Sequence, residues 1–301
     1  MTILATDRLD KSFGYVHAVN QLSLTVEEGQ VYGILGPNGS GKTTTLSMLS
    51  GIIRPDSGTY SWFGNLRGPA ANRRIGALIE TPNFYPYLNL ERNLRIVCRI
   101  KEIDERDIHR VIKLVGLESR RLSLFQTLSF GMKQRLALAS LLLGDPEVLV
   151  LDEVTNGLDP EGIAEVRMLI RQIAATGKTI ILASHILDEV EKVCSHVVIL
   201  KQGKKLAEGA VDNLVRGKDI LIVSSEHTDQ LDQVLAGSTL VASCSREGDE
   251  FHLTLKDHHT PADLSKEMME KGVVLSRLEV KKSRLEDQFL ELVKQDNTLK
   301  P

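Results

Sequence analysis

The 301 residues are enough for one large domain or two ordinary ones, and a content of 42% hydrophobic and 26% charged residues suits a chain that buries a core. A formal net charge of −3 argues against a protein whose main task is to bind nucleic acid or an anionic membrane. The three cysteines are widely spaced and match neither a metal-ligand pattern nor a disulfide framework, which favours a reducing cytosol. No signal peptide is recognisable after Met1, and the longest apolar runs are too short to cross a bilayer.

The N-terminal part resembles the opening of a parallel α/β unit. Short strands are expected at Ile3–Leu9 and Leu22–Val26, followed by a more apolar strand at Val31–Leu35. The third strand leads into the stretch GPNGSGKTT and then into a helix over Thr43–Ser50. Strand, glycine-rich turn and helix in this order are typical of a parallel α/β fold.

The middle of the chain predicts a helical insert. From Leu90 to Leu128 apolar residues recur at helical spacing and no strand-like alternation is present, so we expect a helical subdomain over about residues 88–143. The α/β alternation then resumes. The expected elements are a helix at Lys133–Leu143, a strand at Val148–Leu151, a helix at Glu161–Thr176, a strand at Thr179–Ala183, and a hairpin of His196–Leu200 and Lys204–Ala207.

The pattern changes around Arg216-Gly217, where we place a domain boundary between residues 1–216 and 217–301. The second part predicts the order βαββαβ of the ferredoxin-like split unit, followed by a last helix. The expected elements are Ile220–Ser224, Thr228–Leu235, Leu240–Ser245, Phe251–Leu255, Pro261–Lys271, Val273–Val280 and the last helix Leu285–Lys294.

The strongest motif is GPNGSGKT at residues 36–43, a phosphate-binding loop. Its glycines let backbone N–H groups line an anion-sized concavity, and the following helix aims its positive end at the same point. Lys42 adds a mobile cation for the outer phosphates, and the Thr43 hydroxyl can join the shell of Mg²⁺. A glycine-rich surface turn is the alternative, but the position between an apolar strand and a helix argues against it. The expected nucleotide-binding residues here are Gly36, Pro37, Asn38, Gly39, Ser40, Gly41, Lys42, Thr43 and Thr44.

A second half-site follows from VLVLDE, residues 148–153. The apolar strand carries Asp152 to its C-terminal end, where parallel sheets bind ligands and where the carboxylate can hold Mg²⁺. Glu153 is a candidate general base for an attacking water, which favours hydrolysis over binding alone. A solvated strand end is the alternative for such a pair of acids.

The stretch LSFGMKQR, residues 128–135, resembles the signature sequence of ATP-binding-cassette (ABC) ATPases. It occurs with the phosphate loop, with LVLDE, with the loop Asn156–Asp159 and with Ala183-Ser184-His185, so the resemblance covers roughly the first seven-tenths of the chain. The stretch RLEDQFLELV, residues 284–293, is similar to the small C-terminal domain of many bacterial exporter ATPases. The fold class that this implies is α/β, an ABC-type P-loop ATPase with a helical subdomain, plus a small α+β domain.

The resemblance also implies a set of shared sites. Two subunits would pack head to tail, so that each ATP lies between the phosphate loop of one and the signature of the other. Ser129, Gly131 and Met132 would then bind the partner's ATP, and Asp159 would bridge the two sites. Met132 stands where the family has Gln, which leaves the side-chain contact of that residue in question.

Further roles come from the same resemblance. His185 would contact the γ-phosphate and position the attacking water, although a histidine at such a place, taken alone, is more often a capped structural residue. Phe13 would stack on adenine, with Tyr15 as the alternative. Phe130 replaces the usual Gly of the signature and Val154 the usual Pro after the Asp-Glu pair, changes expected to affect side-chain contacts and backbone stiffness rather than phosphate recognition.

The stretch IETPNFYPYLNL contains a further departure, because Glu80 stands where the family has a glutamine that touches Mg²⁺ and the attacking water. ABC ATPases that export bacitracin and lantibiotic peptides are similar in carrying Glu with an aromatic loop. Glu80 is therefore expected to be a metal and catalytic residue, with a solvated strand end as the alternative. The loop Pro82–Tyr87 is expected to dock a membrane subunit, with a self-packed loop as its alternative.

Together these features imply the ATP-hydrolysing motor subunit of a bacterial ABC exporter, with ATP and Mg²⁺ as cofactors. Its expected partners are a second copy of itself and permease subunits on separate chains, without nucleic acid. It would lie in the cytoplasm on the inner face of the membrane. The alternatives are a soluble ABC ATPase that works on ribosomes or DNA, and a regulator that closes on ATP without turnover. A single phosphate loop and a short insert without heptads argue against the ribosomal and DNA types, and Glu153 and His185 against the regulator.

Overall fold

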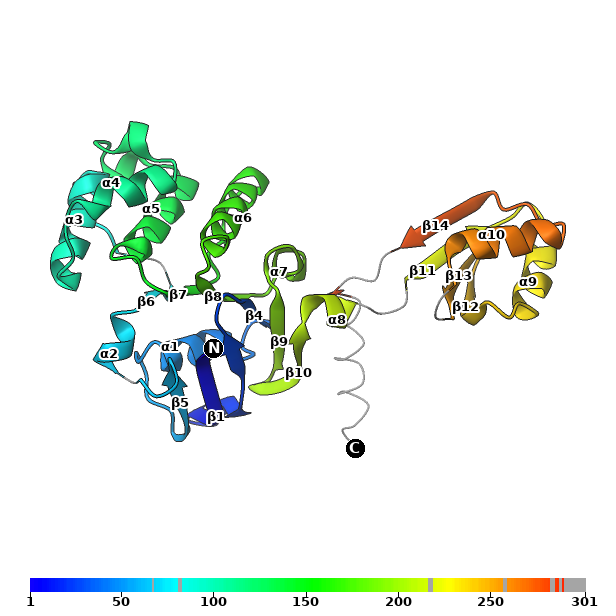
Figure 1. Cartoon of the computed structure of the whole chain (residues 1–301), viewed down its shortest axis with the longest axis horizontal. Helices are drawn as coiled ribbons and strands as arrows, with labels where there is room; N and C mark the ends of the chain where they lie inside the picture. The colour runs from blue at the N-terminus through cyan, green and yellow to red at the C-terminus, as the bar shows by residue number, and fades with distance from the viewer. Residues whose placement is uncertain are drawn as a thin grey trace. The chain divides into compact units, whose positions relative to one another are not determined.

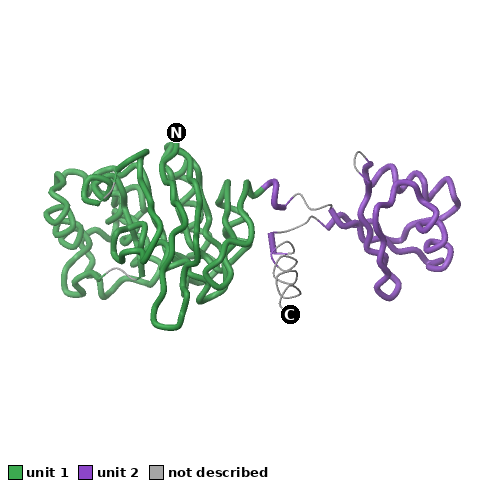
Figure 2. Tube along the Cα trace, turned by 90° about the horizontal axis from the view of Figure 1, so that it is seen from below, with its two compact units in different colours: residues 1–211 green, residues 212–301 purple. Residues whose placement is uncertain are grey.

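The structure is a computed structural model. It describes residues 1–66, 68–80, 83–215, 219–256, 259–281, 285–286 and 289. The chain divides into two units, residues 1–211 and 212–301 (Figure 2). The expected boundary at Arg216-Gly217 and most of the expected last helix lie outside the described residues. Within the part of the chain that the structure describes, no helix is both long and apolar enough to cross a membrane.

Unit 1 is built around a six-stranded sheet of mostly parallel strands. Its order is β10 (Lys204–Ala210), β9 (His196–Lys201), β4 (Val31–Leu35), β8 (Thr179–Ser184), β7 (Val148–Asp152) and β6 (Ile75–Leu78). Strands β9, β4, β8, β7 and β6 are parallel, and only β10 runs antiparallel to its neighbour. The central strands β4, β7 and β8 are buried along their whole length, which explains their continuous apolar sequences.

An antiparallel sheet forms a second layer of unit 1. It consists of β1 (Thr2–Phe13), β2 (Val16–Leu22), β3 (Thr25–Glu27) and β5 (Ser57–Trp62). Helix α1 (Lys42–Leu49) shares one hydrophobic core with both sheets, in which its Leu46 packs with Leu4 of β1 and Val150 of β7. The helix that follows the phosphate loop is thus fixed from two sides.

The expected single strand Leu22–Val26 is wrong, because the structure divides it between β2 and β3. The Thr6 hydroxyl donates a hydrogen bond to the Leu22 carbonyl (3.0 Å) and accepts one from the Leu24 N–H (2.9 Å). A side chain therefore takes the place of the strand ladder at this point, and the two flanking pieces pair with different parts of β1.

The expected helical insert is confirmed, and its helices gather on one part of unit 1 (Figure 1). It contains α3 (Leu90–Lys101), α4 (Asp107–Leu114), two short 3₁₀ helices and α5 (Phe130–Leu142). Helix α5 begins three residues earlier than expected, because Ser129 caps it. The other helices of unit 1 are α2 (Pro69–Asn72), α6 (Pro160–Ala174) and α7 (Leu187–Val193), and α8 (Val211–Val215) follows β10.

Unit 2 confirms the expected βαββαβ order. Its elements are β11 (Ile220–Ser224), α9 (Thr228–Ala236), β12 (Val241–Glu247), β13 (Glu250–Leu255), α10 (Pro261–Glu270) and β14 (Arg277–Lys281). The sheet order is β12-β13-β11-β14, and both helices contribute to its core. The last strand begins later than expected, because Val273 is a buried core residue in the turn after α10, where its N–H donates to the Met268 carbonyl.

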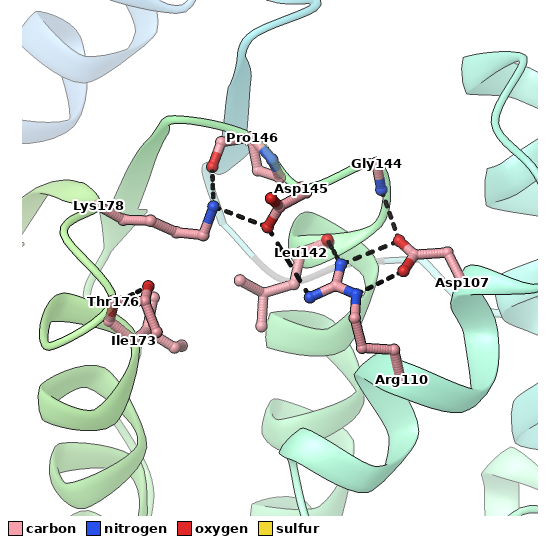
Figure 3. Close-up of polar contacts among 9 residues, drawn as sticks. All are labelled: Asp107, Arg110, Leu142, Gly144, Asp145, Pro146, Ile173, Thr176 and Lys178. Carbon is pink, nitrogen blue, oxygen red and sulfur yellow. Dashed lines mark hydrogen bonds and ion pairs between the residues drawn. The ribbon is translucent and has the colours of Figure 1, made fainter.

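A polar network fastens α4 to the turn that leads from α5 into β7 (Figure 3). Arg110 of α4 donates two hydrogen bonds to the Asp107 carboxylate, at 2.5 and 3.0 Å, and one to the Leu142 carbonyl at 2.8 Å. The same carboxylate accepts a hydrogen bond of 2.8 Å from the Gly144 N–H. The end of α5 is therefore tied to α4 through both a carbonyl and an amide.

The network continues to the segment between α6 and β8. The ammonium group of Lys178 donates to the Pro146 carbonyl (2.6 Å) and pairs with Asp145 (2.8 Å). Asp145 also lies 3.8 Å from the guanidinium of Arg110. A single carboxylate thus lies between a cation from the helical part and a cation from the segment that precedes β8.

Replacing Asp107 by alanine should lower the free energy of unfolding of unit 1 by about 1–3 kcal/mol at pH 7, because Arg110 and the Gly144 N–H lose their shared acceptor. Burial alone raises the pKa of Asp107, but the hydrogen bonds from Arg110 and Gly144 outweigh it and hold the pKa below its ordinary value. The stabilisation should therefore be complete above the ordinary aspartate pKa and disappear as the pH falls through the lowered one.

Urea denaturation followed by Trp62 fluorescence measures this, since Trp62 is the single tryptophan and is buried in unit 1. Arg106→Ala is the matched control, because its ion pair to Asp104 is long (3.8 Å) and exposed and should contribute less than about 0.5 kcal/mol. Equal effects of the two variants would contradict the assigned role of Asp107.

Candidate functional site

The phosphate loop connects β4 to α1 through a backbone that only glycine allows at its last position. Gly41 precedes the helix with φ +100°, and a Cβ built on it would lie 2.2 Å from the Ala18 carbonyl oxygen. Lys42 is almost fully buried, and its ammonium group donates to the carbonyls of Gly36 (2.8 Å) and Pro37 (3.3 Å). The lysine thereby folds back over the loop, where its charge faces an incoming phosphate.

Two buried oxygen atoms near this loop lack a hydrogen-bond partner among the described residues, the Ser40 hydroxyl and one carboxylate oxygen of Asp152. Burial raises the pKa of Asp152, and the nearby charge of Glu153 and of Glu80 adds to the rise, whereas a hydrogen bond from the Thr43 hydroxyl opposes it. Unpaired buried oxygens are rare in proteins and mark positions for a ligand or ion.

Of the residues expected to hold Mg²⁺, Thr43 and Glu80 both influence the pKa of Asp152, the first by a hydrogen bond and the second by its charge. Among the described residues, no group of three or more His, Cys, Asp or Glu forms a complete metal site. Two carboxylates and a hydroxyl suit Mg²⁺, which takes few protein ligands and completes its shell with water and substrate phosphates.

The carboxylate of Glu153 contacts two side chains, the ammonium group of Lys42 and the imidazole of His185. One carboxylate oxygen lies 3.3 Å from the Lys42 ammonium, and the other lies 2.7 Å from Nδ1 of His185. The backbone of Glu153 is left-handed, with φ +49°, and its N–H donates to the Ala183 carbonyl. Glu80 is also left-handed, with φ +66°. Such strained conformations cluster at functional sites.

A second cluster lies where α5 and α6 begin, around a hollow of about 430 Å³. Ser129, Gly131 and Asp159 line it, together with Phe130 and Gly157. Ser129 and Asp159 cap the two helices, accepting hydrogen bonds from the N–H groups of Met132 (3.3 Å) and Gly162 (2.9 Å), respectively. Two positive helix ends therefore border one hollow, whose lining also contains the guanidinium group of Arg135 and the carboxylates of Asp159, Glu161 and Glu165.

Three polar contacts near these clusters were not predicted from the sequence. The Gln134 amide of α5 donates to the Val154 carbonyl (2.9 Å) and so links the signature helix to the segment after Glu153. The Thr155 hydroxyl donates to the Glu189 carboxylate of α7 (2.6 Å). The third connects Asn93 of α3 to the aromatic loop and is described next. Gln134 lies within the quoted signature, but its partner is distant in sequence.

The expected docking loop is anchored at one end and exposed at the other, and its Pro82 lies outside the described residues. The buried amide of Asn93 accepts a hydrogen bond from the Tyr85 N–H (2.8 Å) and donates to the Tyr85 carbonyl (3.1 Å). Phe84 packs on Phe125, whereas the side chains of Tyr85 and Tyr87 are 47% and 67% exposed. The rigid backbone therefore presents two tyrosines to solvent.

Phe13 lies at the end of β1 with half of its surface exposed, and the Lys11 ammonium lies 5.4 Å from the centre of its ring. Tyr15 is fully exposed at the tip of the same hairpin. The following strand, β2, contributes Ala18, whose carbonyl touches Gly41 of the phosphate loop. The hairpin is thus attached to the nucleotide side of the sheet, which leaves Phe13 and Tyr15 both available as an aromatic platform.

Comparison with known proteins identifies the family of the chain. The family model for the ABC transporter matches residues 19–156. The bacitracin transport ATP-binding protein BcrA of Bacillus licheniformis is 36% identical over 309 residues, covering 97% of each chain. The Nod factor export ATP-binding protein I of Burkholderia lata is 39% identical over 217 residues, covering 70% of this chain and 71% of that one. The resemblance drawn from the motifs is confirmed.

Solved structures show the same fold. A bacterial ABC transporter cassette solved as a dimer matches with a TM-score of 0.62 at 22% identity, over 69% of this chain and 99% of that one. The predicted α/β fold class is confirmed.

Asp152→Asn should raise the free energy of unfolding by about 1 kcal/mol at pH 7 without nucleotide or Mg²⁺, because it removes a buried charge and keeps an acceptor for Thr43. An acid whose pKa is raised by folding destabilises the fold above its ordinary pKa. The difference in the free energy of unfolding between Asp152→Asn and wild type should therefore become smaller as the pH falls, because Asp152 of the wild type then takes up a proton. Trp62 fluorescence in urea measures it, and Asp188→Asn, on the exposed face of α7, should leave the free energy of unfolding unchanged.

Proposed function

The chain belongs to the family of ABC transporter ATP-binding proteins, which hydrolyse ATP, and on this premise we propose that it is the motor subunit of a bacterial exporter. In this proposal it closes as a dimer when ATP binds and drives membrane subunits that are separate chains. Its cofactors are ATP and Mg²⁺. It acts on the cytoplasmic face of the membrane, to which its partners attach it.

The observation that carries the proposal is the chain of contacts from Lys42 through Glu153 to His185. The lysine ammonium has three donors, and they meet the carbonyls of Gly36 and Pro37 and the Glu153 carboxylate. A phosphate that binds Lys42 must replace one of these acceptors, and Glu153 is the one on a movable side chain. Nucleotide binding thus releases Glu153 from the lysine and leaves it paired with His185.

The released carboxylate is suited to act as a general base. Glu153 accepts the proton of the attacking water, and His185, held by the carboxylate through Nδ1, presents its other ring nitrogen to the γ-phosphate. Thr43, Asp152 and Glu80 hold Mg²⁺. When bound, the ion neutralises charge on the phosphates during transfer. Lys42 and the backbone N–H groups of the phosphate loop fix the orientation of the triphosphate.

Closure as a dimer is supported by the second cluster. Ser129 and Asp159 cap two helices beside one hollow, and this arrangement offers N–H groups and positive helix ends to an anion. The γ-phosphate of a second copy's ATP is the anion we assign to it, and the cassette solved as a dimer supports this assembly. Each copy would then supply half of two sites.

Coupling to membrane subunits is supported by the aromatic loop. Tyr85 and Tyr87 are exposed on a backbone that Asn93 holds rigid, so they bury area in an interface at little entropic cost. The relatives that match are named for bacitracin transport and for Nod factor export. We propose export of a peptide antibiotic, because Glu80 and the aromatic loop resemble those of bacitracin exporters and the bacitracin relative is 36% identical over 97% of this chain. A Nod factor export protein of Cupriavidus metallidurans matches over a similar length, at 34% identity.

Glu153→Gln should abolish ATP hydrolysis, by a factor of at least about 100, while nucleotide binding persists, since the amide cannot accept the proton. Blocked hydrolysis should trap the closed form, so the variant should shift from monomer to dimer when ATP and Mg²⁺ are added. Size exclusion with light scattering measures the mass, and a phosphate-release assay measures the rate.

Two results would count against this part of the proposal. Hydrolysis that survives in Glu153→Gln would remove Glu153 from its role as base. A variant that binds ATP but remains monomeric with Mg²⁺ present would mean that this chain does not close on ATP by itself.

Glu80→Gln should leave the rate at saturating Mg²⁺ within about threefold of wild type and raise the Mg²⁺ concentration for half-maximal rate on the order of 30-fold. The reason is the loss of one carboxylate near the ion, worth about 2 kcal/mol for a unit charge about 4 Å from a divalent ion in water. Titrating Mg²⁺ at fixed ATP measures it, with Glu118→Gln, an exposed glutamate of the helical part, as control. Superimposable Mg²⁺ titrations of wild type and Glu80→Gln would exclude Glu80 from the metal site.

A further inference from the structure

The segment that carries Glu153 is held in an unfavourable conformation by contacts beyond the motif itself. Glu153 has φ +49°, in the left-handed region that few non-glycine residues adopt. The residues after it form tight turns, in which the Asn156 N–H donates to the Glu153 carbonyl and the Leu158 N–H donates to the Thr155 carbonyl. Residues 153–158 are thus connected by two successive turns, so a contact made by Thr155 also constrains the backbone next to Glu153.

Two side-chain contacts connect this segment to the one that carries His185. The first is the 2.7 Å contact between Glu153 and His185. The second is the 2.6 Å hydrogen bond from the Thr155 hydroxyl to the Glu189 carboxylate. Thr155 lies two residues after Glu153, and Glu189 lies four residues after His185 in the first turns of α7, so the contacts run side by side between the same two segments.

The second contact is the stronger candidate for a permanent anchor. Thr155 is buried and Glu189 half-buried, so a hydroxyl bound to a carboxylate here is little exposed to competing water. The contact between Glu153 and His185 is more exposed at the histidine, and both groups must engage substrate during turnover. The anchor is thus separate from the atoms that react.

We propose that Thr155 and Glu189 are positioning residues for ATP hydrolysis. The Thr155 hydroxyl, held by the Glu189 carboxylate, fixes the segment of Glu153 against the segment of His185, and so sets where the base lies relative to the attacking water. This inference rests on the proposed role of Glu153. It also assigns a task to α7, which connects the histidine segment to β9.

Thr155→Val removes the hydroxyl at nearly constant volume and should lower kcat roughly 10–100-fold, the range expected when a catalytic group is misplaced by about an ångström. The KM for ATP and the affinity for a fluorescent ATP analogue should stay within about twofold, because Lys42 and the phosphate loop are untouched. Thr155→Ser, which keeps the hydroxyl, should restore kcat. Thr176→Val is the matched control, since its hydroxyl bonds only to the Ile173 carbonyl at the end of α6.

Glu189 provides a second variant for the case in which Thr155→Val does not fold. Glu189→Gln keeps an oxygen acceptor for the hydroxyl and should retain most of the kcat, whereas Glu189→Ala should lose as much as Thr155→Val. A wild-type kcat in both Thr155→Val and Glu189→Ala would overturn the proposal. A fall in kcat with an equal loss of ATP affinity would do the same, because it would show a general structural effect.

The Glu153→Gln variant separates this inference from the proposed function. If Glu153 is the base and Thr155 positions it, Thr155→Val should lower the residual hydrolysis of Glu153→Gln by less than about twofold. A further loss of 10-fold or more in the double variant would show that Thr155 acts independently of Glu153 and would overturn the inference alone. Full hydrolysis by Glu153→Gln would instead refute the function assigned to Glu153.

Discussion

The parallel pairing of β4, β8, β7 and β6 is the constraint on which the site depends. Its register places Leu35 beside Ser184, Asp152 beside Ala183, and Leu78 beside Leu151, so that the strands end at a common edge. The phosphate loop, the histidine segment, the Asp-Glu pair and Glu80 each follow one of these ends. Since β4, β7 and β8 are buried on both faces, a shift of one residue would misplace every side chain at once, and the register is fixed.

This edge concentrates negative charge before a nucleotide arrives. Glu80, Asp152 and Glu153 lie close together, and burial with the charge of the other two raises the pKa of Asp152. Lys42 offsets part of this charge through its ion pair with Glu153, and His185 contacts the same carboxylate through Nδ1. A triphosphate adds several negative charges, so binding it at this edge requires a cation beyond the lysine. The same electrostatic balance therefore argues that Mg²⁺ binds with the nucleotide, and that a phosphate replaces Glu153 as a partner of Lys42.

The sequence predicted best those features whose residues are neighbours in the chain. The phosphate loop, the Asp-Glu pair and the helical insert could be predicted because their residues are contiguous and their periodicity is strong. Pairings over long sequence distances could not, and these include the bond of Gln134 to Val154 and that of Thr155 to Glu189. A glutamine on a helix or a glutamate after a histidine has many possible partners, and only the fold selects one.

The role of Asn93 could have been predicted in part from the spacing of apolar residues in the sequence. It lies on the buried face of α3, at a spacing where Leu90 and Leu94 are apolar, so a polar residue there predicts a buried hydrogen-bonding role. The prediction of a single strand over Leu22–Val26 was wrong for the opposite reason. Its sequence is regular, but the hydroxyl of Thr6, on another strand, replaces the ladder at that point.

The departure of Phe130 from the family signature is explained by what surrounds it. Phe130 is half exposed at the hollow, and a Cβ on Gly157 would lie 3.3 Å from its ring, so the phenylalanine packs over the loop between Glu153 and Asp159. Ser129 still caps α5, and the N–H groups of its first turn remain in place. The larger side chain thus fills space against the neighbouring loop and leaves the donors unchanged. An anion at this hollow would still meet the N-terminal end of α5, and the ring of Phe130 would form part of the surface beside the anion.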